Sequence, residues 1–411
     1  MKQGFHSQVA KTQDQAAAGS WRRKTAAAVM AVAVTLPLLA QQSRIYRDGN
    51  SWVEEITGTL PAAREFRVNT DIGSVEMQGN SPRISYTIRK RSYAPSRKGA
   101  QRQFEQMRIS TGKNADTDFI EGRLLSKNLA HFSTDFMIQV PRELGVVKVE
   151  TRSGILSFDS ISATIFGTTG GGSVKLDNLL GAVKIATGGG TVDGGNLGGD
   201  FSLTSGGGDV HINNIAGQAH LTMGGGRVYI GTARASTIQT GAGGIEVRKC
   251  DGDLQVSTEG GNLNFGDVNG ALRADTGGGS VRLASAQGPV QVTTGGGSVE
   301  LYNLSQGAQV ETGAGSIMVE FLAGRGFAPS SLHTAAGDVS VCIPGNLPVT
   351  VHASSDMVTG HGIQSELSGL RITSSGEYGP KAMYAEGALN GGGPMLRVRT
   401  TIGQINFRHC H

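Results

Sequence analysis

The chain has 411 residues, of which 63 are glycine and 5% are aromatic, and its formal net charge is +4. The glycine content is about twice the average of ~7%. So few aromatic residues exclude an ordinary globular core and indicate a thin core of small β-branched side chains. The glycines recur with a fixed period, which excludes a disordered glycine-rich chain and indicates turns in an ordered array.

Residues 1–40 have the pattern of an export signal. The basic segment 21–24 (WRRK) precedes an apolar run at 25–39, and Ala40 is a small residue suited to a cleavage site. The alternative is a retained membrane anchor, but fifteen residues containing Pro37 are short against the ~20 needed to span a bilayer. We therefore expect cleavage after Ala40, and membrane contact only if residues 25–39 are retained.

Residues 41–150 are predicted to form a strand-rich region that continues into the repeats. Strands are expected at 65–68, 74–77, 83–91, 118–125 and 135–140. A short helix is expected within residues 95–107, with Phe104 and Met107 on one face.

The densest charge of the chain lies in this region. It comprises Arg89, Lys90, Arg91, Arg97, Lys98 and Arg102. A solvated edge strand and helix is the favoured interpretation, and a contact with anionic envelope polymer or lipid headgroups is the alternative. An exported chain without an aromatic–basic surface is not expected to bind nucleic acid.

Residues 151–320 repeat. An apolar residue follows each glycine cluster in steps of 18, with a single step of 17, at Val174, Val192, Val210, Val228, Ile245, Leu263, Val281, Val299 and Ile317. Each unit has two halves in which apolar and polar residues alternate, as in a strand buried on one face. The pattern predicts an all-β parallel solenoid with coils of about 18 residues, whose strands stack ~4.8 Å apart.

Other repeat architectures fit less well. An antiparallel meander would also place strands at nine-residue intervals, but the similarity of successive units favours parallel coils. Propeller blades need about 40–50 residues per repeat. A left-handed hexapeptide helix would need an apolar residue at every sixth position. Counted from Val192, those positions are occupied by Gly198 and Thr204, which are not apolar in this sense.

Residues 321–411 are predicted to form irregular coils and a C-terminal cap. Residues 321–332 are an insertion, residues 335–341 form one further turn, and a cap must cover the last open sheet edge. Cys250, Cys342 and Cys410 make an odd count, so one pair can bridge in an oxidising compartment. Cys342 and Cys410 both lie near the cap, but the sequence leaves the pairing open.

The outward positions of the two halves carry mixed polar side chains. In one half of the coils they are Lys175, Asp193, His211, Tyr229, Glu246, Asn264, Arg282, Glu300 and Met318. In the other half they are Lys184, Ser202, His220, Gln239, Gln255, Arg273, Gln291 and Gln309. Neither row stacks carboxylates on adjacent coils, as a polysaccharide-cleaving solenoid would.

The candidate metal ligands of the sequence form no repeating site. The aspartate ladder of calcium-binding repeats is absent. His211 and His220 fall on opposite halves of one coil, and the tail 409–411 (HCH) is weak evidence for a transition metal. We therefore predict no catalytic, cofactor-binding or metal site, no cofactor and no enzymatic activity.

A hydroxyl-bearing residue precedes most glycine clusters. This row contains Thr169, Thr187, Thr240, Thr276, Thr294 and Thr312, interrupted by Ser205 and Met223. A structural ladder, hydrogen-bonded along the stack, is the favoured interpretation. An ice-binding surface would need two aligned rows, and only one is visible.

The chain resembles the bacterial "putative adhesin" β-strand-repeat family, whose function is unknown. The resemblance rests on the segments 66–75 (FRVNTDIGSV), 136–141 (FMIQVP) and 389–403 and on the repeated GGGSV units, and it spans about residues 60–408. It implies an exported or membrane-associated solenoid of the cell envelope.

The leading functional hypothesis is a non-enzymatic exported solenoid acting through surface contacts, in adhesion or as a cell-envelope scaffold. Its location would be the periplasm or the cell surface, and its partner an envelope polymer, a glycan or another envelope protein. A membrane-tethered envelope-stress protein is the alternative, and a carbohydrate-active enzyme on a β-helix is the third.

Overall fold

The structure is a computed structural model that describes residues 41–61, 63–114, 116–126, 131–324, 326–358, 361–375 and 381–410. The chain divides into two units, Met1–Leu38 and Leu39–His411. The predicted export signal lies outside the described residues, so its cleavage stays a prediction. Within the ranges described, no helix has both the length and the apolar character needed to cross a membrane. The predicted boundaries at residues 40, 150 and 320 also stay predictions.

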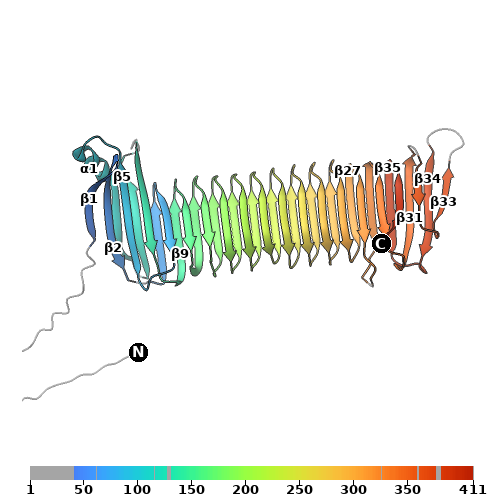
Figure 1. Cartoon of the computed structure of the whole chain (residues 1–411), viewed down its shortest axis with the longest axis horizontal. Coiled ribbons are helices and arrows are strands. Elements are labelled where there is room, and N and C mark those ends of the chain that lie inside the picture. The colour runs from blue at the N-terminus through green and yellow to red at the C-terminus, as the bar shows by residue number, and fades with distance from the viewer. Residues whose placement is uncertain are drawn as a thin grey trace, which may run out of the picture. The chain divides into compact units, whose positions relative to one another are not determined.

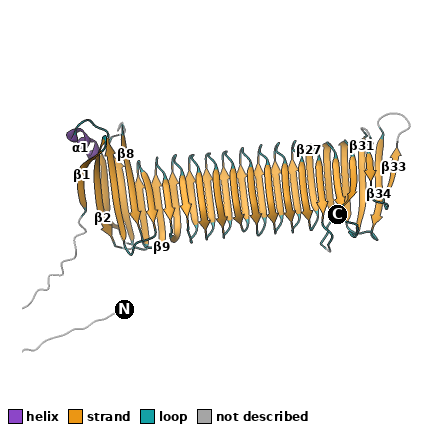
Figure 2. Cartoon of the chain, viewed as in Figure 1, coloured by secondary structure: helices purple, strands orange, loops and turns teal. Residues whose placement is uncertain are grey.

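Two long sheets face each other, and the chain alternates between them (Figures 1 and 2). We call them sheet A and sheet B. In the regular coils, sheet A contains β10 (Leu156–Asp159), β12 (Val174–Asp177), β14 (Val192–Leu197), β16 (Val210–Ile215), β18 (Val228–Ala233), β20 (Ile245–Cys250), β22 (Leu263–Val268), β24 (Val281–Ala286), β26 (Val299–Leu304) and β28 (Ile317–Phe321). Sheet B contains β11 (Ser162–Thr169), β13 (Val183–Thr187), β15 (Phe201–Ser205), β17 (Ala219–Met223), β19 (Ser236–Thr240), β21 (Leu254–Thr258), β23 (Leu272–Thr276), β25 (Val290–Thr294) and β27 (Ala308–Ala314).

The regular strands pair in parallel with the same half of the next coil. Val174 pairs with Val192 in sheet A, and Val183 pairs with Phe201 in sheet B. The predicted all-β parallel solenoid is therefore confirmed, and the antiparallel meander is excluded. Alternate residues of each strand are buried between the sheets, and Val281 for example is 1% exposed. The next coil places an equivalent apolar side chain one step along the stack. Each coil therefore covers the apolar side chains of its neighbours.

The buried hydroxyl row lies at the end of the sheet B strands. Thr276 and Thr294 donate hydrogen bonds to the carbonyls of Gly261 and Gly279 in the preceding coil, at 3.0 and 2.9 Å. Thr187 instead donates to Gly189 in its own turn, at 2.7 Å. The predicted ladder is structural, but its hydroxyls bond to turn carbonyls rather than to one another. Because these side chains are buried, they cannot form an ice-binding surface.

The N-terminal region closes one end of the stack with antiparallel strands. It contains β1 (Gln42–Asp48), β2 (Ser51–Leu60), β3 (Glu65–Thr70), β4 (Ser74–Gln78), β5 (Ile84–Ser92), α1 (Arg97–Glu105), β6 (Met107–Asn114), β7 (Thr117–Leu124), β8 (Phe132–Gln139) and β9 (Glu143–Thr151). In sheet A, β1, β2, β5 and β8 pair antiparallel in that order, and in sheet B β6 pairs antiparallel with β7. The predicted helix is present, but Met107 does not lie on its face: the helix ends at Glu105, and Met107 is buried from β6.

The C-terminal region departs from the order of the chain. It contains β29 (Ser330–Ala336), β30 (Val339–Ile343), β31 (Val349–Met357), β32 (Ile363–Ser365), β33 (Arg371–Ser375), β34 (Ala382–Leu389), β35 (Met395–Ile402) and β36 (Ile405–His409). The last two strands insert next to β29 and β30, and the earlier strands β31 and β32 lie beyond them (Figure 1). A disulfide between Cys342 and Cys410 joins β30 to the residue after β36, and the third cysteine, Cys250, is buried and free.

Candidate binding surfaces

The outward row of sheet A has the register that the repeat predicts. Its members pair in sequence from Lys175 and Asp193 through to Glu300 and Met318. Charges of both signs alternate with neutral groups, and Arg282 forms an ion pair with Glu300 at 3.3 Å. From Lys175 to Glu300 this face therefore presents one polar side chain per coil without a block of like charge, and the row ends at the apolar Met318.

The outward row of sheet B corrects one predicted residue. Thr237, not Gln239, pairs with both His220 and Gln255. The single 17-residue step arises between β18 and β19, where the turn has two residues instead of the three between β16 and β17. Because this one-residue shortening precedes β19, the equivalent of His220 is residue 237 instead of 238, and Gln239 lies two places further along the strand, opposite Thr222 and Ser257.

A first groove, which we call the tyrosine groove, lies on sheet A over β16, β18, β20 and β22. Its volume is about 470 Å³, and Tyr229, Glu246 and Asn264 contribute to its walls. The His211 ring stacks on Tyr229, with 4.5 Å between centroids and 5° between planes. His211 comes from β16, so it covers the face of Tyr229 that looks away from β20. Arg248 approaches the ring from β20, at 5.9 Å from the centroid.

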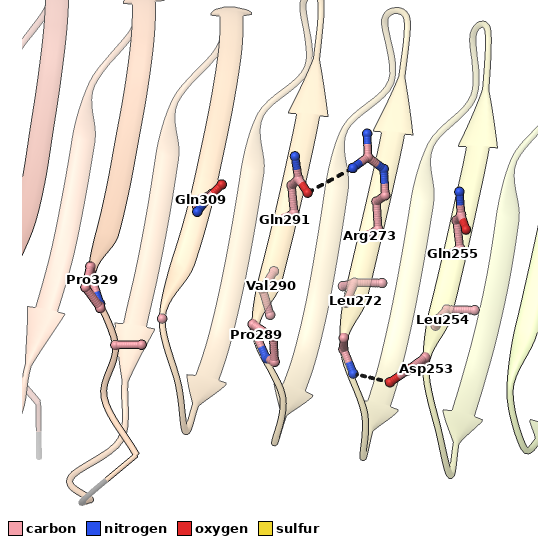
Figure 3. Close-up of a pocket in the computed structure, with 13 residues that line it drawn as sticks. Asp253, Leu254, Gln255, Leu272, Arg273, Pro289, Val290, Gln291, Gln309 and Pro329 are labelled. Carbon is pink, nitrogen blue, oxygen red and sulfur yellow. Dashed lines mark hydrogen bonds between the residues drawn. The ribbon is translucent and has the colours of Figure 1, made fainter.

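A second groove, which we call the amide groove, runs along sheet B across consecutive coils (Figure 3). Its volume is about 400 Å³. It is lined by Asp253, Leu254, Gln255, Ala271, Leu272, Arg273, Pro289, Val290, Gln291, Gly307, Gln309, Ala328 and Pro329. The residue that precedes each strand forms the floor, and the outward row forms the wall. The predicted row thus supplied the wall, whereas the contribution of the 321–332 insertion was not predicted.

The strand half of the N-terminal basic cluster is paired with carboxylates. Glu55 is 5% exposed and binds both Arg44, at 2.6 Å, and Arg89, at 2.9 Å. Burial alone would raise the pKa of Glu55, but hydrogen bonds from these two guanidinium groups hold that pKa below its usual value. Lys90 binds Glu54 at 2.9 Å.

The other members of this cluster lie nearer to solvent. Arg91 approaches Asp48 at 3.5 Å, and the helix residues Arg97, Lys98 and Arg102 are exposed. The helix part of the cluster is solvated as predicted, but the predicted solvated edge strand is wrong: β5 pairs with both β2 and β8, and Lys90 is buried between them. Contact with an anionic polymer stays a prediction.

The structure shows where the candidate metal ligands His211, His220 and Cys410 lie. His211 lies in β16 of sheet A and His220 in β17 of sheet B, so the two rings project from opposite faces. Cys410 is bonded to Cys342, which removes its thiolate as a ligand. Across the described ranges, no group of three or more His, Cys, Asp and Glu residues is placed to hold a metal ion.

Comparison with known proteins gives names but little similarity. No protein-family model matches the chain, and no curated protein matches it. Among solved structures it is similar to a "putative cell adhesion protein" from Clostridium sporogenes, at 10% identity and a TM-score of 0.20, covering 87% of this chain and 100% of the other. A "putative adhesin" from Bacteroides fragilis has 13% identity, a TM-score of 0.24 and coverage of 70% and 96%.

A "putative adhesin" from Parabacteroides merdae has 11% identity, a TM-score of 0.22 and coverage of 72% of this chain and 98% of that chain. These structures bear the name of the family that the sequence resembles. At these identities and TM-scores they carry no argument about what this chain binds.

Proposed function

We propose that the protein is a non-enzymatic, exported solenoid that acts through contacts made by its outer faces, as an adhesin or a scaffold of the cell envelope. The observation that carries the proposal is the regular outer row of each sheet. One polar side chain recurs per coil, in register from Lys175 to Glu300 on sheet A and from Lys184 to Gln309 on sheet B. Many weak contacts at a fixed spacing add to strong binding of a repetitive partner.

The disulfide supports the exported location. Disulfides persist in oxidising compartments such as the periplasm and the cell surface, and they are rare in the cytosol of mesophiles. The bond between Cys342 and Cys410 holds the end of β36, the last strand of the chain, to β30. Within residues 1–40, a basic segment followed by an apolar run is the pattern of an export signal, and it supports the same location.

The first test is fractionation of native cells, followed by mass spectrometry of the mature N-terminus. We expect a protein that begins at Gln41 in the periplasm, at the cell surface or in the medium. The purified mature protein, fluorescently labelled, should then bind to whole cells or to isolated envelopes. Recovery of the protein from the cytosol, or lack of binding to any envelope fraction, would contradict the proposal. An uncleaved chain in the inner membrane would instead support the membrane-tethered alternative.

A further inference from the structure

The floor of the amide groove is small and mostly apolar. Ala271, Pro289 and Gly307 precede three consecutive sheet B strands, so they line up along the stacking direction. Pro289 is exposed, and Ala271 is partly exposed. This row therefore forms a shallow channel across several coils, and apolar C–H groups of a ligand can pack on it.

The wall of the groove offers one planar polar group per coil. Gln255, Arg273, Gln291 and Gln309 pair in register on four neighbouring strands. Arg273 Nη1 donates to Gln291 Oε1 at 3.0 Å, which holds two of these groups in place (Figure 3). A primary amide both donates and accepts hydrogen bonds, as a hydroxyl does. Three amides and one guanidinium, one group per coil, therefore complement a ligand that carries a hydroxyl-rich repeat.

The insertion after β28 borders one end of the groove through Ala328 and Pro329. The Phe327 ring of this insertion packs edge-on against the Phe321 ring, with 5.1 Å between the ring centroids. Ser330 Oγ accepts from the Ala308 N–H at 3.1 Å and donates to the Ala328 carbonyl at 3.0 Å. The groove therefore has a defined end and a limited length.

The charge of the groove is nearly balanced. Arg273 Nε donates to Asp275 Oδ2 at 3.2 Å, and Asp253 Oδ1 accepts the Ala271 N–H at 2.8 Å. A site for a polyanion would need several unpaired cations along its length. The groove instead suits an uncharged polymer.

We propose that the amide groove binds a linear, uncharged glycan lying along the stacking direction. This rests on the proposed function, because it names the ligand class for one of the outer faces. Parallel strands repeat every ~4.8 Å, which is close to the length of one sugar unit in an extended polysaccharide. Each coil then offers one side chain of the wall to the hydroxyl groups of one sugar, while the C–H face of the sugar packs on the floor.

The test is calorimetric titration of the mature protein with hexasaccharides of β-1,4-linked glucose, N-acetylglucosamine and mannose. At least one should bind, and its affinity should rise from the disaccharide to the tetrasaccharide or pentasaccharide and then level off. The Arg273→Ala and Gln291→Ala variants should each bind that sugar about tenfold more weakly, a change equal to about 1.4 kcal/mol. Gln287→Ala is the matched control, since Gln287 is an exposed glutamine of the same coil outside the groove.

Failure to bind any of the three hexasaccharides would overturn the proposal. So would unchanged binding by both groove variants, provided that circular dichroism shows each to be folded. Tighter binding of heparin than of every neutral hexasaccharide would replace the ligand class with a polyanion. If the parent and the groove variants bind whole cells equally while no hexasaccharide binds, the glycan proposal fails and the proposed surface function stands.

Discussion

The regular coils and the two ends of the solenoid keep their register by different means. In the regular coils every strand pairs with the same half of the next coil, and repeated side chains stack in rows. At the ends, strands that do not repeat also pair through backbone ladders, and single side-chain interactions reinforce this pairing. Glu55 links β2 to its neighbours β1 and β5, and a disulfide holds the final strand β36 to β30. Loss of one side chain should therefore act on neighbouring coils in the middle and on one particular strand at an end.

The largest effect is expected from a charge inside the regular coils. Val281→Asp places a carboxylate at a position that is 1% exposed, and an unpaired charge there should cost about 3–5 kcal/mol. Thermal unfolding followed by circular dichroism measures the loss. Asn264→Asp is the control, because it adds a carboxylate to the exposed outer row beside Arg282. If the Val281→Asp variant melts with the parent, Val281 is outside the core and the register is wrong.

The second-largest effect is expected from loss of the disulfide, which should destabilise the C-terminal end and leave the regular coils unchanged. Cys342→Ser and Cys410→Ser each remove the disulfide, and the loss should be about 2–4 kcal/mol. Hydrogen exchange followed by mass spectrometry should show faster exchange in β35 and β36, while β14 to β24 exchange as in the parent. The parent under a reducing agent is the control and should match the variants. Uniformly faster exchange throughout the coils would show that the end is not an independent element.

Repetition made the regular coils predictable, and its absence limited the prediction of the ends. Val174 and its equivalents identified the buried rows, because alternation and an 18-residue step together specify which side chains face inward. The outward position of β19 was misplaced: the shortened turn before β19 brings the equivalent of His220 one residue earlier, to Thr237, and Gln239 is the next outward residue of the same strand. The insertion of β35 beside β29 was not predicted, because no local pattern records which distant strand becomes the neighbour.

The same reasoning applies to the amide groove. The row containing Arg273 and Gln291 follows from the repeat, so the wall was visible in the sequence. Pro329 reaches the groove through an insertion that interrupts the repeat, and nothing in its sequence specifies where it packs.

A third, smaller effect tests how closely the regular coils approach one another. Gly190 has φ +106°, and a Cβ there would meet the carbonyl oxygen of Gly172 in the preceding coil. Gly190→Ala should therefore cost about 1–3 kcal/mol, because of backbone strain and crowding. The control is the adjacent Gly189→Ala, where a Cβ would meet nothing within 4 Å. Equal stability of the two variants would contradict this packing of the turns.

The smallest effect concerns the N-terminal end and depends on pH. Glu55→Gln removes the charge that Arg44 and Arg89 bind, and since Arg44 is largely exposed we expect a loss of about 1 kcal/mol at neutral pH. The pKa of Glu55 is lowered in the folded protein, so its ionised form stabilises the fold above the pKa of the unfolded chain. This contribution disappears as the pH falls through the lower, folded pKa.

The free energies of unfolding of the parent and the Glu55→Gln variant should therefore converge in acid and differ most near neutral pH, as measured by urea unfolding across that range. Glu76→Gln is the control, because Glu76 is exposed on β4 of the same sheet and has no cation partner in the described residues. A difference between parent and variant that stays constant down to the lowest pH would mean that Glu55 acts through packing, and that a charge does not hold this end.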